Sequence, residues 1–155
     1  QLAPADSPVF AQGSVGWELH EVVRCRSWDH YIEKKLPSAF VGTDLADWLS
    51  KYHIDTVVIV GYMTHNCDDA TSKHALHAGL AVEFLSDAAG SLSYINKAGS
   101  ASAEELHRTF SIVMQSRFAA VMHTEEWIQL LRTHHPAQRD NIVKSNQRAR
   151  MAASA

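Results

Sequence analysis

The chain has 155 residues, the length of one domain, and its 46% hydrophobic and 20% charged residues are enough to bury an ordinary globular core. Its formal charge of -3, with no basic block in the body of the chain, argues against a protein that binds nucleic acid or a membrane surface. We find no membrane-spanning run and no signal-peptide pattern at Gln1. Cys25 and Cys67 do not make a disulfide framework, so a reducing, cytoplasmic setting is expected.

The first third of the chain predicts a loop, a short strand and a helix. Residues 1–29 show little periodicity and are punctuated by Pro and Gly, which predicts a loop-like segment. Residues 30–33 are a short strand candidate. Thr43 and Asp44 then cap a helix that runs through Lys51, with apolar residues at helical spacing on one face.

The stretch from Thr56 to Ala75 contains the best candidate for a reactive group. Five β-branched residues ended by Gly61 predict a strand buried on both faces, as in a parallel sheet, and Asn66 then caps a helix with two acids in its first turn. Cys67 therefore lies where a strand turns into a helix. The unpaired backbone N–H groups at a helix start favour the reactive thiolate form of a cysteine. Ligands of α/β proteins also bind at this end of the strands. The alternative is that Cys67 is simply a small buried apolar residue.

The rest of the chain alternates between strands and helices. Gly79 ends the helix that follows Cys67, and residues 81–85 form the next strand. A polar loop over residues 90–100 precedes a helix whose start, at Ser102, has the spacing of a capping box. Residues 118–122 are a further strand and Thr124 begins a further helix. This order predicts an α/β fold, a parallel sheet with helices on both faces.

From Pro136 the composition changes, so we assign residues 1–135 to the α/β domain and residues 136–155 to a tail. This tail contains four basic residues and a single acidic one, Asp140. The tail is either frayed and disordered or an arm that orders against a neighbouring subunit.

Three motifs resemble those of the isochorismatase-like cysteine hydrolases. They are Lys-Lys-Leu-Pro-Ser-Ala-Phe-Val-Gly-Thr-Asp-Leu at residues 34–45, Gly-Tyr-Met-Thr-His-Asn-Cys at residues 61–67 and Ser-Asp-Ala at residues 86–88. The resemblance runs from about Phe10 to Trp127. It implies a Rossmann-like α/β layer and a Cys-Asp-Lys catalytic triad.

The matched positions imply roles for particular residues. Cys67 would be the nucleophile, and Lys34 rather than Lys35 would be the triad lysine, because it stands four residues before the serine of Ser-Ala-Phe. A cis peptide bond is implied between Tyr62 and Met63, and the N–H groups of Met63 and Cys67 would form an oxyanion hole. The possible pocket residues are Trp17, Phe40, Tyr62 and Thr64.

The chain departs from the family's pattern at its beginning. Family members open with a strand that ends in the catalytic aspartate, then a helix and a second strand, and the sequence shows none of these before Phe10. Asp6 and Asp29 follow no buried apolar strand, so neither is assigned to the triad. We therefore expect that an N-terminal segment is missing, that another chain supplies it, or that the remaining strands pair differently.

The resemblance implies a hydrolase that cleaves a small amide- or vinyl-ether-type substrate with a thiolate nucleophile. The alternative is an inactive relative or incomplete fragment with a binding or assembly role. No metal and no cofactor are expected, because the Asp-x-His-x-x-His cluster of the nicotinamidases is absent from the sequence. The expected partners are a small-molecule substrate and further copies of the chain, without nucleic acid or membrane. Cys25 is expected to be a bystander and Asp87 a structural residue.

Overall fold

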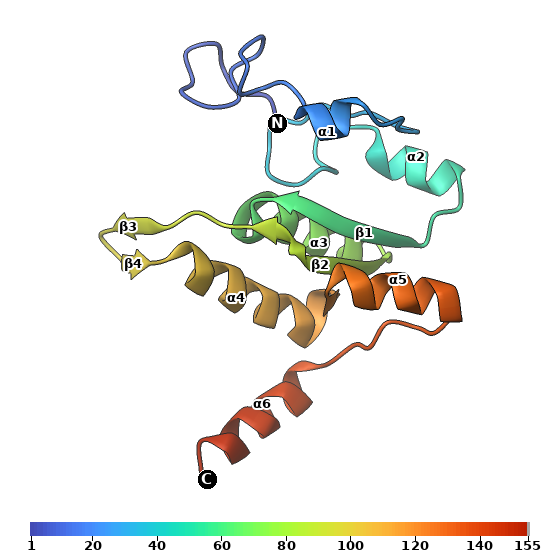
Figure 1. Ribbon diagram of the computed structural model, residues 1–155, viewed down its shortest axis with the longest axis vertical. Coiled ribbons are helices and arrows are strands. Elements are labelled where there is room, and N and C mark those ends of the chain that lie inside the picture. The colour runs from blue at the N-terminus through green and yellow to red at the C-terminus, as the bar shows by residue number, and fades with distance from the viewer. Residues whose placement is uncertain (155) are drawn as a thin grey trace.

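A parallel sheet in the order β1-β2-β5 forms the centre of the computed structural model, which describes residues 1–154 (Figure 1). Its strands are β1 (Thr56–Tyr62), β2 (Ala81–Gly90) and β5 (Ala120–Met122), and the strands β3 (Tyr94–Asn96) and β4 (Gly99–Ala101) form a separate antiparallel hairpin. The helices are α1 (Glu21–Arg24), α2 (Leu45–Lys51), α3 (Asp69–His77), α4 (Ala103–Val113), α5 (Thr124–Thr133) and α6 (Ile142–Ala152). Two wide helical turns are η1 (Thr64–Asp68) and η2 (Met114–Phe118).

Helices cover both faces of this sheet, as predicted. On one face Val82 and Phe84 of β2 are fully buried against α2, α3 and the junction of α4 with η2. On the other face Leu85, Ala120 and Met122 pack against α5. Because side chains alternate along a strand, β2 is buried on both faces, and the α/β fold class is confirmed.

Several predicted helix boundaries are confirmed by their capping groups. Gly79 follows the last turn of α3 with a φ of +87°, a conformation that glycine adopts without strain. Ser102 Oγ accepts a hydrogen bond from Glu105 N at 3.1 Å, while Glu105 Oε2 accepts one from Ser102 N at 2.8 Å, so the predicted capping box is present. Each of these helix ends is determined by a few residues that are adjacent in the sequence, so the sequence alone is enough to predict it.

The predicted strand at residues 30–33 is wrong. These residues form no strand, and His30 instead stacks on Trp48 of α2 at 5.1 Å and hydrogen-bonds Asp44 at 2.9 Å. The segment lies beside α2, and within residues 1–154 it pairs with no strand. Loop-like structure in residues 1–29 is confirmed, apart from the single helical turn α1.

The prediction that the strand before Cys67 is buried on both faces is also wrong. Within residues 1–154, β1 pairs with β2 alone, and Val58 and Val60 are 36% and 52% exposed. These two side chains point to the face that α5 covers, but α5 packs over β2 and β5 and does not reach β1. A run of β-branched residues predicts a strand, but it does not reveal how many neighbours the strand has.

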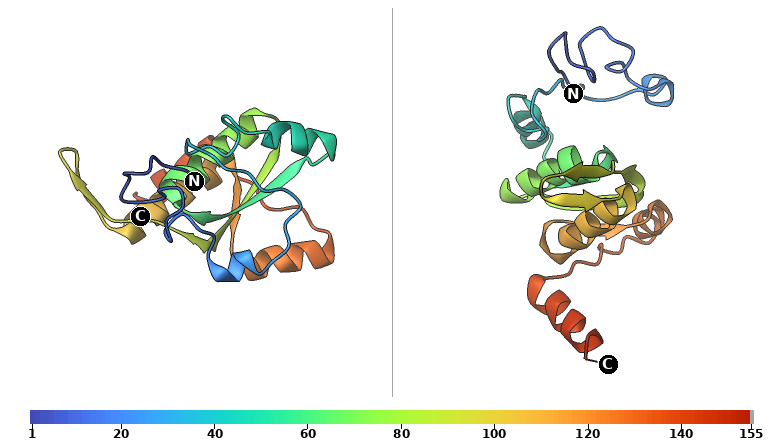
Figure 2. Two further views of the ribbon diagram at one scale, coloured as in Figure 1. Left: turned by 90° about the horizontal axis from the view of Figure 1, so that it is seen from above. Right: turned by 90° about the vertical axis from the view of Figure 1, so that its left-hand side faces the viewer.

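Two segments predicted as irregular are regular. The polar loop at residues 90–100 contains most of the hairpin β3–β4, which projects from the body of the molecule (Figure 2). In the C-terminal tail, residues 142–152 form α6, which is capped by Asn141. In Figure 1 and in the right-hand view of Figure 2, α6 extends away from the sheet, and its role as an inter-subunit arm stays a prediction. No helix among residues 1–154 is long and apolar enough to cross a membrane.

Candidate active site

Cys67 lies in the wide turn η1, at the carboxyl end of β1. Met63 O accepts hydrogen bonds from both Asn66 N and Asp68 N, at 3.0 and 3.2 Å, so the chain winds more loosely here than in an α-helix. The predicted start of the helix at Asn66 is therefore wrong: Met63 precedes the wide turn, and α3 begins after it. The peptide bond between Tyr62 and Met63 is cis, as the resemblance implies.

Lys34 is in direct contact with the sulfur of Cys67. Lys34 Nζ lies 3.2 Å from Cys67 Sγ and also donates to Leu36 O at 3.0 Å and Pro37 O at 2.7 Å. The two carbonyl groups belong to the loop that follows Lys34, so local backbone holds the ammonium group beside the sulfur. An adjacent cation stabilises a thiolate relative to a thiol.

The side chain of Gln1 also reaches Cys67. Its Oε1 lies 3.3 Å from Cys67 Sγ, as an acceptor for the thiol proton. The first residues are fixed to the Lys34 segment by a backbone hydrogen bond from Leu2 N to Lys34 O at 2.7 Å. Residues far apart in the sequence therefore meet at one sulfur atom.

A cavity of about 310 Å³ opens beside Cys67. Its lining residues are Lys34, Ala39, Val58, Ile59, Val60, Tyr62, Cys67, Asp68 and Thr71. Most of this wall is apolar, and it carries one cation and one acid. A small, mostly uncharged molecule with a single polar centre suits such a wall.

Asp68 is a residue of the site that the sequence alone does not identify. It is 5% exposed, although an acid in the first turn of a helix is expected at the surface. Burial raises the pKa of its carboxyl to about 6, and the Lys34 charge opposes this rise only in part. No sequence signal indicates that the turn is wide, so nothing in the sequence predicts that the residue after Cys67 also faces the cavity.

The other predicted pocket residues are divided. Tyr62 lines the cavity, whereas Trp17, Phe40 and Thr64 are not among the lining residues. Phe40 belongs to the core and stacks on His74 at 4.8 Å. Thr64, the first residue of η1, is fully buried. Phe40 therefore serves in the core.

Thr64 and His65 connect the wide turn to the region around the hairpin. Thr64 Oγ1 donates to Gly90 O at 2.9 Å and lies 2.8 Å from Nδ1 of His107. His65 bonds Tyr94 of β3 through Nε2 at 2.9 Å, and burial lowers its pKa although the charge of Asp69 opposes that effect. Through these contacts the first two residues of η1 are attached to the end of β2, to α4 and to β3.

The remaining candidates lie elsewhere. Lys35 lines a separate surface hollow with residues near the N-terminus, and Cys25 is exposed on the N-terminal segment. Asp87 accepts hydrogen bonds from Thr124 N and Oγ1, at 2.8 and 2.9 Å, and so ties β2 to the start of α5. Within residues 1–154 no group of three or more His, Cys, Asp or Glu is arranged to hold a metal ion.

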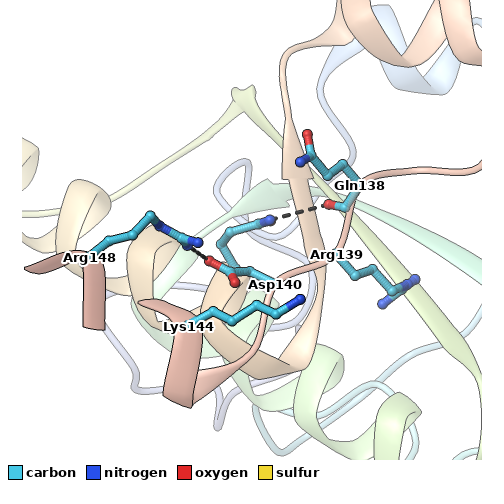
Figure 3. Close-up of a pocket in the computed structure, with 6 residues that line it drawn as sticks. Gln138, Arg139, Asp140, Lys144 and Arg148 are labelled. Carbon is cyan, nitrogen blue, oxygen red and sulfur yellow. Dashed lines mark hydrogen bonds and ion pairs between the residues drawn. The ribbon is translucent and has the colours of Figure 1, made fainter. Parts of the chain in front are cut away.

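A larger cavity of about 590 Å³ lies between the C-terminal segment and η2 (Figure 3). Figure 3 shows Arg148 paired with Asp140 and Lys144 beside them, and Arg139 donates to Val82 O at 2.9 Å. Its charged groups thus already serve to attach the C-terminal segment, and its walls contain no cysteine. The smaller cavity at Cys67 is the candidate active site because a nucleophile and a cation meet there.

Known proteins resemble the chain over most of its length. The family model "Isochorismatase domain" matches residues 2–126. A crystal structure of a protein from Burkholderia xenovorans LB400, provisionally named an isochorismatase, is 61% identical with a TM-score of 0.96; the match covers 99% of this chain and 74% of that one. The uncharacterized isochorismatase family protein YddQ of Bacillus subtilis is 29% identical over 120 residues, which is 77% of this chain and 67% of the relative.

A further relative carries the name of a specific enzyme. Nicotinamidase 3 of Arabidopsis thaliana is 31% identical over 91 residues, which is 59% of this chain and 41% of that protein. The family model alone matches far more than half of the chain. The chain therefore belongs to the isochorismatase family, whose members are generally hydrolases.

Proposed function

We propose that the protein is a cysteine hydrolase that cleaves small amides, with Cys67 as the nucleophile. The observation that carries this proposal is the distance of 3.2 Å between Lys34 Nζ and Cys67 Sγ at the edge of a mostly apolar cavity. A buried structural cysteine needs no cation beside its sulfur, whereas a nucleophile gains thiolate character from one.

The reaction would proceed through a covalent intermediate. The Cys67 sulfur forms a bond to the substrate carbonyl carbon, whose oxygen becomes an oxyanion, and the N–H groups of Met63 and Cys67 are the proposed donors to that oxygen. The C–N bond then breaks as a proton passes to the leaving nitrogen. Water attacks the resulting thioester, which releases the acid and restores the thiol.

The wall of the cavity and the named relative both favour a small amide. Val58, Val60 and Tyr62 form an apolar wall, and a volume of about 310 Å³ is at the lower end for ligand pockets, which suits a molecule of one ring or less. The name of Nicotinamidase 3 implies amide hydrolysis for that relative. A vinyl-ether substrate, as the family's name implies, is the second class to be tested.

Ammonia release is the direct test. The purified protein is incubated with small primary amides, nicotinamide among them, and ammonia is measured together with the mass of the intact protein. We expect ammonia from at least one amide, a mass increase at Cys67 that matches its acyl group, and neither result with Cys67→Ala. If Cys67→Ala releases ammonia at the same rate, Cys67 is not the nucleophile. If neither an amide nor a vinyl ether is cleaved, the protein is an inactive relative with a binding or assembly role.

A further inference from the structure

Helix α6 lies beyond the part of the chain that defines the family. The family model ends at residue 126, and α6 extends from the region of η2 away from the sheet (Figure 1). The structure of the Burkholderia xenovorans relative matches 99% of this chain with a TM-score of 0.96, and this match includes α6. The direction of the helix is therefore shared by the two proteins, and membership of the family does not explain it.

Contacts within its own chain hold the base of α6 but leave the helix uncovered. Asn141 caps its first turn, and Arg148 pairs with Asp140. No residue of α6 is buried, and its main contact is with η2. A helix of 11 residues is marginal in water by itself, because helices in proteins gain most of their stability from the packing of an apolar side. A surface outside its own chain would supply the packing that α6 lacks.

Exposed apolar side chains lie at the end of α4 and in the first turn of α6. Ile112 and Val113 are exposed on α4, and Ile142 and Val143 are exposed on α6. The residues that follow Ile112 and Val113 by four positions line a hollow of about 510 Å³ together with Ile142 and Val143. We name these four apolar residues the α4–α6 patch. An exposed apolar surface of this kind is typical of a protein–protein contact.

The charges of the chain indicate which partner fits this patch. Residues 1–135 contain 10 basic and 16 acidic residues, whereas residues 136–155 contain four basic residues and one acid. The basic tail of one copy is therefore attracted to the acidic body of another copy. The same acidic body would repel nucleic acid, so a second copy of the chain fits the basic tail better.

The spacing of residues along α4 and α6 gives a specific match. In α6, Ile142 and Arg150 are eight residues apart. In α4, Glu104 and Ile112 have the same separation, which is about 12 Å along a helix. When the two helices lie antiparallel with Ile142 of one copy on Ile112 of the other, Arg150 therefore lies beside Glu104. Neither charged residue makes an ion pair within residues 1–154, so both are available for this contact.

We propose that α6 of one copy packs antiparallel against α4 of a second copy, and that the second copy does the same in return. The contact is two-fold symmetric, because each copy supplies both an arm and the surface that receives it. The α4–α6 patch forms its apolar part, and Arg150 of one copy pairs with Glu104 of the other. This inference is independent of the hydrolase function proposed above.

Site-specific disulfide formation tests this arrangement. A tagged chain with Ile112→Cys is mixed with an untagged chain with Ile142→Cys, and both carry Cys25→Ala and Cys67→Ala so that no other thiol reacts. After oxidation with diamide, we expect a linked pair of summed mass in which peptide mass spectrometry finds position 112 joined to position 142. The control pairs Ile112→Cys with Ile95→Cys, at a hairpin isoleucine that is 86% exposed, and should give about tenfold less of the linked pair.

Charge reversal tests the register of the two helices. Arg150→Glu, introduced into both chains, should slow the formation of the linked pair about tenfold, because two acids then meet at the contact. Glu104→Arg, added to the same chains, should restore the rate. Arg26→Glu, at an exposed position of the N-terminal segment, is the control and should change the rate less than about threefold.

Three results would overturn the proposal. The first is a yield of the 112–142 pair no higher than that of the Ile95→Cys control, which is what association through other surfaces would give. The second is an unchanged rate in Arg150→Glu. The third is the absence of a linked pair together with binding of a labelled oligonucleotide that Arg150→Glu abolishes, which would assign the arm to nucleic acid.

Discussion

Lys34 Nζ and Cys67 Sγ are 3.2 Å apart although their residues are separated by 33 positions in the sequence. The ammonium group has three protons, and its contacts to the sulfur and to the carbonyl oxygens of Leu36 and Pro37 account for all three. The loop after Lys34 thus fixes the direction of the side chain before any substrate is bound. Such preorganisation lets a charge act on the sulfur without further rearrangement.

Removal of the Lys34 charge should therefore lower both the reactivity of the Cys67 thiol and the rate of amide hydrolysis. Lys34→Met keeps about the same side-chain length but removes the cation that lies beside the Cys67 sulfur. We expect amide hydrolysis to drop about a hundredfold or more, measured as ammonia release. Lys35→Met, at the adjacent position, is the control and should stay within about threefold. A larger loss from Lys35→Met would show that the motif is assigned to the wrong lysine.

Chemical labelling distinguishes accessibility from reactivity. Cys25 is exposed and Cys67 is half-buried, so accessibility alone favours Cys25. If the site activates its thiol, iodoacetamide should modify Cys67 first in the folded protein near neutral pH, as read by peptide mass spectrometry. In denaturant the two cysteines should react at similar rates. Faster labelling of Cys25 in the folded protein would mean that Lys34 does not activate Cys67.

The features that the sequence predicts well depend on short-range signals or on a motif. Gly79 and the Ser102–Glu105 capping box identify helix ends from a few adjacent residues, and both are confirmed. The parallel strands β2 and β5 follow from apolar runs between helices. Lys34 and Cys67 could be paired only through the motif spacing, because no local pattern relates residues that are so far apart.

The features that the sequence does not reveal depend on tertiary surroundings. The exposure of Val58 depends on which strands lie beside β1. The same run of β-branched residues would form a strand with one neighbour or with two, so it does not predict this exposure. The burial of Asp68 is set by the wide turn, which has no compositional signature here. The hairpin over residues 94–101 has Asn96-Lys97-Ala98-Gly99 at its tip, which is a weaker signal than Asn-Gly or Asp-Gly.

The raised pKa of Asp68 predicts a change in stability with pH. A carboxyl whose pKa is about 6 in the folded protein and 3.8 unfolded binds more protons when folded between these values. Its contribution to stability is therefore present below about pH 4 and is lost as the pH rises to about 6. Asp68→Asn should thus be more stable than the unchanged protein at pH 7 by about 1–2 kcal/mol, after allowance for solvent that reaches the cavity, and nearly equal at pH 4.

Urea unfolding of the two proteins at both pH values checks this difference. Because only the difference between variant and unchanged protein is used, other groups such as His65, whose pKa is lowered, cancel to first order. The opposite result would be a variant whose stability, relative to the unchanged protein, is lower at pH 7 than at pH 4. It would mean that the fold stabilises the charged form of the Asp68 carboxylate.

The hydroxyl of Thr64 attaches η1 to its neighbours, so its loss should affect the stability of the fold more than the labelling of Cys67. Thr64 is fully buried, and its hydroxyl contacts Gly90 O and His107 Nδ1. Since a hydroxyl has one proton, the His107 nitrogen is the donor when Thr64 donates to Gly90. Thr64→Val keeps the shape but leaves both partners unsatisfied, which should cost about 1–3 kcal/mol. Thermal and urea unfolding would measure this loss, with Ser93→Ala as an exposed hydroxyl control.

The open side of β1 predicts that the 155-residue chain associates with itself. Val58, Val60 and Tyr62 alternate along the strand and are 36%, 52% and 50% exposed, and β1 pairs with β2 alone within the described residues. An apolar strand with an unpaired edge is a template for another copy. Val60→Lys adds a charge at this half-exposed position on the edge strand, which disfavours strand addition. Val15→Lys, at a loop valine that is 88% exposed, is the matched control.

Light scattering at several protein concentrations measures the effect. We expect the unchanged protein and Val15→Lys to show masses above the 17.2 kDa of one chain that rise with concentration, and Val60→Lys to stay closer to 17.2 kDa. The comparison separates the strand edge from general surface hydrophobicity, because both substitutions replace an exposed valine by lysine. A monodisperse species of 17.2 kDa for all three proteins would mean that the chain protects β1 by itself.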